Sequence, residues 1–357
     1  MSLRADASLS RLTTLRLGGP ARRLVTVTTE EELVEAVATP DPEGGPTLLL
    51  GGGSNVVVAD DGYDGTVVHV ATRGVTVRDA PGADGLVHVE VAAGEPWDAV
   101  VARCVADGLA GVECLAGIPG ATGATPIQNV GAYGQEVAQT IVAVRAYDRV
   151  ERAVVELAAA DCAFSYRHSR FKGDDRFAIL AVTFALRRDP DGGAARYGEL
   201  ARALGVEAGA AVPLAAAREA VLGLRAGKGM VLDPADHDTW SAGSFFTNPI
   251  LEPQAFAALV ERAGADLEPP RYPEADGRVK TSAAWLIERA GFAKGYAGPA
   301  GLGGRVALST KHTLALTNRG GATTADLLTL ARDVRDGVEV RFGVRLVPEP
   351  VLVGVTL

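Results

Sequence analysis

The sequence predicts a mixed α/β fold that begins with two small lobes. Short apolar stretches that alternate like strands recur between stretches whose apolar residues have helical spacing, and this alternation is typical of α/β proteins. The chain has 357 residues, of which 47% are hydrophobic and 22% are charged. A chain of this length and composition can bury two or three hydrophobic cores.

The first half of the chain supplies most of the strand patterns. A capping box at residues 29–32 begins a short helix. Pro96 begins a second helix, and Gly108 ends it. One face of that helix carries Trp97, Val100, Val101, Cys104 and Val105. Strands are expected at residues 24–27, 66–70, 86–91, 141–147, 154–157 and 178–186.

The second half predicts four helices and four strands. An alanine-rich helix covers residues 213–224, an amphipathic helix covers 251–264, and a third covers 283–291, where a glycine stops it. Thr323 caps a fourth helix. One face of this helix carries Leu327, Leu328, Ala331, Val334 and Val338. Strands are expected at residues 306–308, 313–317, 344–347 and 351–355.

Charge and cysteine content exclude several classes of protein. The formal net charge is −9, and no basic patch suggests a nucleic-acid partner. The chain has three cysteines, Cys104, Cys114 and Cys162. Their odd number favours a reducing compartment over a disulfide framework, and their spacing is not that of metal ligands. No apolar run reaches transmembrane length, and residues 1–11 lack the apolar core of a signal peptide. We therefore expect a cytoplasmic protein without a membrane partner.

The most unusual stretch covers residues 117–134, which contain five glycines, two prolines and no charge. Linkers are polar and often charged, so this composition argues against a linker. Glycine lets the main chain approach a ligand closely, and consecutive backbone N–H groups can bind an anion or a flat polar ring system. The alternative is a tight buried crossover between two packed layers.

A second glycine-rich stretch lies upstream, at residues 51–55, between two apolar runs. A pyrophosphate binds well at a turn that offers N–H donors and little side-chain bulk. The stretch is not the dinucleotide fingerprint, because no amphipathic helix follows it. It is not a Walker loop, because it lacks the Gly-Lys-Ser/Thr triplet.

Together the two stretches resemble one family. Leu-Gly-Gly-Gly-Ser-Asn followed by Gly-Ile-Pro-Gly-x-x-Gly-x-x-Pro-Ile-Gln-Asn-x-Gly-Ala-Tyr-Gly is similar to the UDP-N-acetylenolpyruvoylglucosamine reductases, the flavoenzymes that make UDP-N-acetylmuramic acid for peptidoglycan. The resemblance covers residues 12–354. It implies a two-lobed flavin-binding domain of the vanillyl-alcohol oxidase (PCMH) type at residues 12–190, with lobes at about 12–75 and 76–190. A connecting segment at 191–224 and a smaller α+β substrate domain at 225–357 follow.

The resemblance also implies a non-covalently bound FAD and NADPH as the reductant. Most of the cofactor-binding residues that it implies lie in the two glycine-rich stretches. They are Gly51, Gly52, Gly53, Ser54, Asn55, Gly117, Ile118, Pro119, Gly120, Thr122, Gly123, Ala124, Gln128, Asn129, Gly131, Ala132, Tyr133 and Ile179.

Three catalytic residues follow from the family motifs. Arg167 matches the arginine that contacts the reacting carboxylate, and a planar fork of donors suits that task. Ser244 matches the proton donor, and Glu349, between two prolines, matches the catalytic glutamate. The alternatives are a surface hairpin with solvated arginines around residue 167 and a solvent-facing turn glutamate at 349.

Substrate-binding residues are implied in the same way. Tyr197, in a Tyr-Gly-x-Leu segment, resembles the mobile lid of one subgroup of the family, and a partly buried interface tyrosine is the alternative. Lys228 is implied as a ligand, with a solvated lysine as the alternative. Tyr272 and Lys294 are implied to hold the UDP diphosphate. The remaining members of the set are Tyr166, Arg225 and Asn248.

The implied reaction reduces an enolpyruvyl ether. Flavin N5 gives hydride to the CH2 carbon, Arg167 and Glu349 stabilise the charge that builds on the carboxylate, and Ser244 protonates C2. We expect Glu349 to be protonated, with a pKa raised by burial and by the like charge of the substrate. The alternatives are a flavin-dependent carbohydrate oxidase and a catalytically inactive nucleotide-binding protein. The expected partners are the small-molecule substrate and NADPH, and we expect a monomer.

Overall fold

The computed structural model describes residues 1–82 and 84–357. Two compact units account for the chain, and both are built from separate segments. The first unit contains residues 1–7, 21–53 and 64–231. The second contains residues 8–20, 54–63 and 232–357. Because the segments of the two units alternate along the sequence, these units do not test the domain boundaries expected from the sequence, which stay predictions.

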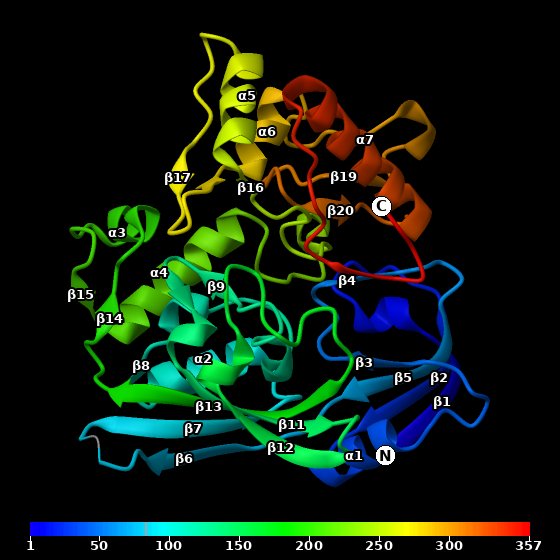
Figure 1. The fold of residues 1–357 in the computed structure, drawn as a ribbon, viewed down its shortest axis with the longest axis vertical. Helices are drawn as coiled ribbons and strands as arrows, with labels where there is room; N and C mark the ends of the chain where they lie inside the picture. Colours follow the sequence, from blue (N-terminus) through cyan, green and yellow to red (C-terminus); the bar gives the residue numbers. More distant parts are fainter. Residues whose placement is uncertain (83) are drawn as a thin grey trace. The chain divides into compact units, whose positions relative to one another are not determined.

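The first unit contains a four-stranded sheet with the order β1-β2-β5-β3 (Figure 1). Its strands are β1 (Ser2–Ser8), β2 (Pro20–Val27), β3 (Thr47–Leu50) and β5 (Tyr63–Val70), of which β3 and β5 are parallel. Helix α1 (Glu30–Ala38) begins where the sequence predicts it, because the Thr29 hydroxyl accepts a hydrogen bond from the Glu32 N–H. The Glu32 carboxylate accepts from the N–H of Thr28 rather than from that of Thr29.

A second, six-stranded sheet lies in the same unit, with the order β12-β11-β13-β7-β6 and with β8 also pairing with β13. Within the described residues, the strand pairings of this sheet are antiparallel. Its strands are β6 (Val75–Asp79), β7 (Leu86–Ala92), β8 (Leu109–Ala110), β11 (Ile141–Asp148), β12 (Ala153–Ala158) and β13 (Phe177–Arg188). The strands predicted in the first half of the chain are therefore confirmed, as is the mixed α/β fold with two lobes.

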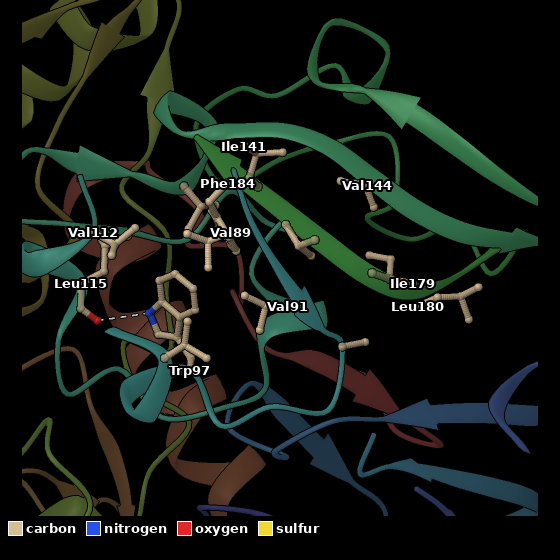
Figure 2. Packing of buried hydrophobic residues seen from close by; sticks show 14 of the residues in the cluster. Val89, Val91, Trp97, Val112, Leu115, Ile141, Val144, Ile179, Leu180 and Phe184 are labelled. Atoms are coloured by element: carbon tan, nitrogen blue, oxygen red, sulfur yellow. Dashed lines mark hydrogen bonds between the residues drawn. The ribbon is translucent and has the colours of Figure 1, made fainter. Parts of the chain in front are cut away.

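The core of this unit lies between the six-stranded sheet and helix α2 (Trp97–Ala106). The buried face of α2 carries Trp97, Val100, Val101 and Cys104, as the spacing predicts. The Trp97 ring lies 5.5 Å from that of Phe184 on β13, and its indole N–H donates to the carbonyl of Leu115 at 3.2 Å (Figure 2). Leu115 lies just before the glycine-rich stretch 117–134, so this core fixes where that stretch begins.

Two short hairpins and two helices complete the first unit. The hairpins pair β9 (Gly131–Ala132) with β10 (Gln135–Glu136), and β14 (Gly193–Ala194) with β15 (Ala211–Val212). Helix α3 (Gly198–Leu204) follows Tyr197 directly. Helix α4 (Leu214–Gly227) is the predicted alanine-rich helix, and its buried face carries Leu214, Ala217 and Val221.

The second unit packs three helices around a separate core. The helices are α5 (Pro253–Ala263), α6 (Ala283–Arg289) and α7 (Thr324–Phe342), and each overlaps a predicted helix. A capping box between Thr323 and Asp326 begins α7, as predicted for Thr323. Three small sheets accompany the helices, with the orders β16-β18-β17, β19-β20 and β21-β4. Their strands are β4 (Val56–Val58), β16 (Ile250–Leu251), β17 (Tyr272–Pro273), β18 (Val279–Lys280), β19 (Val306–Leu308), β20 (Leu316–Asn318) and β21 (Val351–Val353).

Two strand predictions in this unit are wrong in part or in full. The strand expected at 313–317 begins only at Leu316, because the residues before it form a turn in which Ala315 N–H donates to His312 O and Leu314 N–H donates to His312 Nδ1. No strand covers 344–347. That segment is extended, but Pro348 and Pro350 lack N–H groups, so only one isolated bridge forms, between Phe246 and Pro348.

None of the helices within residues 1–82 and 84–357 is both long and apolar enough to cross a membrane. The three cysteines are free and buried. Burial raises the pKa of the Cys104 and Cys114 thiols to about 12, and that of Cys162 to about 11. Because thiolates are the reactive form, the folded chain holds these thiols inert.

This predicts the outcome of thiol titration. At pH 8 the native protein should react with less than one equivalent of a disulfide reagent over minutes, since nearly all three thiols are protonated and shielded. After denaturation in guanidinium chloride, three equivalents should react at once. Equal reaction rates in the native and denatured protein would contradict the burial described above.

Candidate active site

The two glycine-rich stretches pack directly against each other in the first unit. A Cβ atom on Gly52 would lie 2.6 Å from the Cα atom of Gly120, and one on Gly51 would lie 3.1 Å from the Cβ atom of Ala121. Contacts below 3.0 Å are not tolerated, so position 52 excludes any side chain. The glycines therefore build a surface made mainly of backbone, which is what a pyrophosphate or a flavin ring requires.

Helix α4 lies behind the second stretch and carries a buried guanidinium. A Cβ on Gly117 would lie 2.8 Å from Leu222 and 3.4 Å from Nε of Arg225. Arg225 donates through Nη2 to Met230 O, whereas its Nε is buried and has no hydrogen-bond partner among the described residues. Burial lowers the pKa of Arg225. A bound anion would satisfy this orphaned donor, so the residues present fit a phosphate-containing cofactor or substrate.

Several predicted cofactor-binding side chains already have internal partners. The Thr122 hydroxyl donates to Glu95 O at 3.0 Å, and the residue is fully buried. The Asn129 amide donates to Glu136 and to Ser165 O, and its oxygen accepts from Ala138 N–H. These two side chains therefore shape the stretch from inside, and any contact of theirs with a flavin would come from the backbone.

The other predicted cofactor-binding residues include both buried and accessible positions. Gly123 packs against Ala93, where a Cβ would lie 2.6 Å from the alanine Cβ, while Ala124 is exposed. Gly131 and Ala132 form β9. Ile179 is a buried residue of β13 (Figure 2). The half-buried members are Ile118, Pro119, Gln128 and Ser54, and Gly53 is buried in a left-handed conformation.

Arg167 lies next to the second glycine-rich stretch. It occupies a four-residue turn closed by hydrogen bonds between Ser165 and His168, with φ +52°. Its guanidinium donates to Asn129 O at 3.5 Å and to Gly131 O at 3.2 Å. The guanidinium also lies 5.5 Å from the ring of Tyr166. The turn is the hairpin that we considered as the alternative, but Arg167 is half-buried against the stretch rather than solvated.

Tyr197 and Lys228 meet around Tyr133. The rings of Tyr133 and Tyr197 contact edge to face with their centroids 5.9 Å apart, and Nζ of Lys228 lies 5.6 Å from the Tyr133 ring. Lys228 also forms an ion pair with Glu199 at 2.6 Å. Burial raises the pKa of Tyr133, while Lys228 and Arg225 act in the opposite direction. The half of the Tyr197 side chain that remains exposed is the part available to a ligand.

In the second unit, Ser244 and Glu349 lie on two segments that pair directly. Glu349 N–H donates to Phe245 O at 2.8 Å, Thr247 N–H donates to Val347 O at 3.1 Å, and Phe246 forms the bridge to Pro348. Glu349 therefore faces the residue next to Ser244 in the chain. Both residues are half-buried, whereas the neighbouring Phe245 and Phe246 are fully buried.

Asn55, at the end of the first glycine-rich stretch, is linked to the same segment. Its carbonyl accepts from Val351 N–H at 3.0 Å, and its Nδ2 donates to Glu349 O at 3.4 Å. The parallel pairing of β4 with β21 continues from this point. The stretch that ends with Asn55 is thus connected to the backbone of Glu349.

The other predicted substrate residues of this unit are not gathered into one cluster. Asn248 accepts from Ala283 N–H at 3.0 Å and so caps the beginning of α6. Tyr272 lies on β17 and Lys294 in a turn after α6, and both side chains are exposed. No side-chain hydrogen bond joins these two residues within the described part of the chain. Arg167 belongs to the first unit, so its convergence with Ser244 and Glu349 stays a prediction.

Sequence reasoning missed two acidic residues near the glycine-rich stretch. Asp98 accepts from Gly117 N–H at 2.6 Å, and Glu199 pairs with Lys228. Each lies in the first turn of a helix, which is the signal that could have found them. Sequence reasoning also did not predict a cavity of about 420 Å³ in the first unit, whose polar lining includes Glu113, Gln139, Thr140, Arg187 and Arg196.

Comparison with known proteins decides the family. Residues 233–353 match the model of the C-terminal domain of UDP-N-acetylenolpyruvoylglucosamine reductase, and residues 21–154 match that of an FAD binding domain. The chain is 62% identical to the UDP-N-acetylenolpyruvoylglucosamine reductase of Streptomyces coelicolor, over 99% of this chain and 90% of the relative. It is 57% identical to that of Thermobifida fusca, over 100% of this chain and 99% of the relative.

The chain belongs to the UDP-N-acetylenolpyruvoylglucosamine reductase family. A solved structure agrees: the crystal structure of UDP-N-acetylenolpyruvylglucosamine reductase from Thermus caldophilus matches with a TM-score of 0.66 and 25% identity, over 99% of this chain and 100% of that chain. Both glycine-rich stretches lie inside the region that matches the FAD binding domain. Ser244 and Glu349 lie inside the region that matches the C-terminal domain of the reductase family.

The packing of the two stretches predicts the effect of one added methyl group. Gly52→Ala forces the backbone of residue 120 away, and we expect FAD affinity to fall about tenfold, as for an overpacked site that costs about 1.4 kcal/mol. Fluorescence titration of the apoprotein with FAD measures this. Gly301→Ala is the control, because nothing lies within 4 Å of its added Cβ. Equal FAD affinity in the two variants would show that the stretches do not form the cofactor surface.

Proposed function

We propose that the chain reduces the enolpyruvyl ether of UDP-N-acetyl-3-O-(1-carboxyvinyl)-glucosamine to UDP-N-acetylmuramate, with FAD as cofactor and NADPH as reductant. The observation that carries the proposal is the 62% identity, over 99% of this chain, to the reductase of Streptomyces coelicolor. In this chain the segment that contains Ser244 also pairs with the segment that contains Glu349. The orphaned Nε of Arg225 and the backbone surface of the two glycine-rich stretches support a bound, phosphate-containing cofactor.

Arg167 and Glu349 stabilise the charge that develops on the substrate carboxylate. Bound FAD, once reduced by NADPH, supplies the hydride that reaches the CH2 carbon. Negative charge then builds on the carboxylate oxygens. The guanidinium of Arg167, already held by two backbone carbonyls, can offer further N–H donors to these oxygens without reorganising. Such preorganised donors stabilise the intermediate more than the ground state.

Ser244 protonates C2. Its hydroxyl makes no hydrogen bond to the described residues of the chain, so the proton is not already committed to an acceptor. The next two residues, Phe245 and Phe246, are fully buried. A hydroxyl is a weak acid, but it can transfer its proton to a basic carbanion that is held in contact with it.

Glu349 acts in its protonated form. A charged carboxylate beside the anionic substrate would oppose the build-up of charge, whereas a carboxylic acid can donate a hydrogen bond to it. The flanking prolines and the hydrogen bond from Glu349 N–H to Phe245 O restrict how far the side chain can turn away. Substrate binding falls to Tyr166, Tyr197, Arg225, Lys228, Asn248, Tyr272 and Lys294. We place the enzyme in the cytoplasm, as a monomer.

The function is tested by two measurements on the purified protein. We expect the visible spectrum of a bound flavin, and oxidation of NADPH that depends on the UDP-N-acetylglucosamine enolpyruvate. Oxidation of free sugars with O2 would indicate the carbohydrate oxidase, and a colourless protein without NADPH oxidation would indicate the inactive nucleotide-binding protein.

The role of Ser244 can be isolated by half-reactions. In Ser244→Ala, NADPH should reduce the flavin at a rate within twofold of the wild type, while transfer to the enolpyruvate should slow about 10²- to 10⁴-fold. Stopped-flow absorbance of the flavin measures both steps separately. Ser2→Ala, an exposed serine in β1, is the control. Normal transfer in Ser244→Ala would show that another group delivers the proton.

A further inference from the structure

Lys228 has an internal carboxylate partner. Its Nζ lies 2.6 Å from Oε2 of Glu199, and the two side chains are 35% and 30% exposed. Lys228 caps the end of α4, and Glu199 is in the first turn of α3. The ion pair therefore connects two helices through a contact that solvent and ligands can reach.

The same contact restrains the segment that carries Tyr197. Tyr197 is the residue immediately before α3, two positions before Glu199. Its ring contacts Tyr133 edge to face, and Tyr133 lies under Nζ of Lys228 at 5.6 Å. Lys228 thus contacts both Glu199 of α3 and Tyr133 of the second glycine-rich stretch.

The ammonium group of Lys228 cannot bind the Glu199 carboxylate and a diphosphate equally well. A lysine is a compact point charge with three donors, and a diphosphate brings more negative charge and more acceptor oxygens than one carboxylate. An incoming diphosphate that binds Lys228 must therefore compete with Glu199. The ion pair with Glu199 must break before the diphosphate binds Lys228, so the free energy of the pair is subtracted from that of binding. For partly exposed ion pairs this weakens the apparent affinity for the diphosphate about two- to fivefold.

We propose that Glu199 is an internal counter-ion for Lys228, which the diphosphate of a nucleoside diphosphate sugar displaces on binding. The inference rests on the proposed function, because it takes Lys228 as a substrate ligand, and it adds that the group that Lys228 binds is the diphosphate. Displacement breaks the link between Lys228 and α3, so the Tyr197 segment becomes free to move onto the ligand only when the diphosphate is in place. Glu199 is a positioning residue in this scheme, since it acts through Lys228 and not on the reacting atoms.

The test compares two substitutions of Glu199 in the FAD-loaded full-length protein. UDP is the probe, and calorimetry at low salt gives its Kd. Glu199→Gln removes the competing charge and should lower the Kd of UDP about two- to fivefold. Glu199→Asp keeps the charge and should stay within twofold of the wild type. Glu339→Gln, which removes the same charge from a 2.6 Å ion pair with Arg345 on the second unit, should leave the Kd unchanged.

Each other outcome overturns the inference. Unchanged or weaker UDP binding in Glu199→Gln would show that Glu199 does not compete with the diphosphate. The same change in Glu199→Asp and Glu199→Gln would show that the shape of α3 matters and not the charge. If the wild type binds no UDP at all, both this inference and the proposed function fail, whereas normal UDP binding with an inert Glu199→Gln removes the inference alone.

Discussion

In the second unit, the arrangement of the segments that carry Ser244 and Glu349 depends on one short backbone pairing. Two hydrogen bonds, which together form the bridge between Phe246 and Pro348, hold residues 347–349 against residues 245–247. Side chains alternate along such a pairing, so its register decides which groups share a face. In the observed register Glu349 lies opposite Phe245, the neighbour of Ser244 in the chain. The two prolines around Glu349 limit this pairing to a single bridge, because they cannot donate to a ladder, and they also stiffen the backbone on both sides.

Three residues in or beside the second glycine-rich stretch have a strained backbone conformation. Asn129, Tyr133 and Arg167 all have φ between +46° and +52°, the left-handed region that residues with side chains rarely occupy. Each costs about 1 kcal/mol or more and persists only where neighbours hold it. The Asn129 side chain supplies three such hydrogen bonds, and the tight turn at 165–168 supplies two more. In this strained turn, the guanidinium of Arg167 points toward the carbonyls of Asn129 and Gly131.

Much of the fold could be predicted from the sequence, because strand alternation, helix caps and the two glycine-rich stretches are local signals. The strands of the first unit and the capped helices α1 and α7 follow from them. The wrong strand at 344–347 has the right apolar pattern, but the prolines that prevent a ladder lie just beyond it. Partnerships between distant residues leave no local signal. The pairing of Glu199 with Lys228 and the internal bonding of Asn129 could therefore not be predicted.

The segments of the second unit also have a consequence for synthesis. Strand β4 comes early in the chain, yet its parallel partner β21 consists of Val351–Val353, close to the carboxyl end. Chains generally fold from the amino end while the ribosome is still at work. Here the apolar strand β4 stays without its parallel partner until residues 351–353 have been synthesised. The edge of β4 that pairs with β21 is therefore open during this time, and an open apolar edge is prone to pair with other chains.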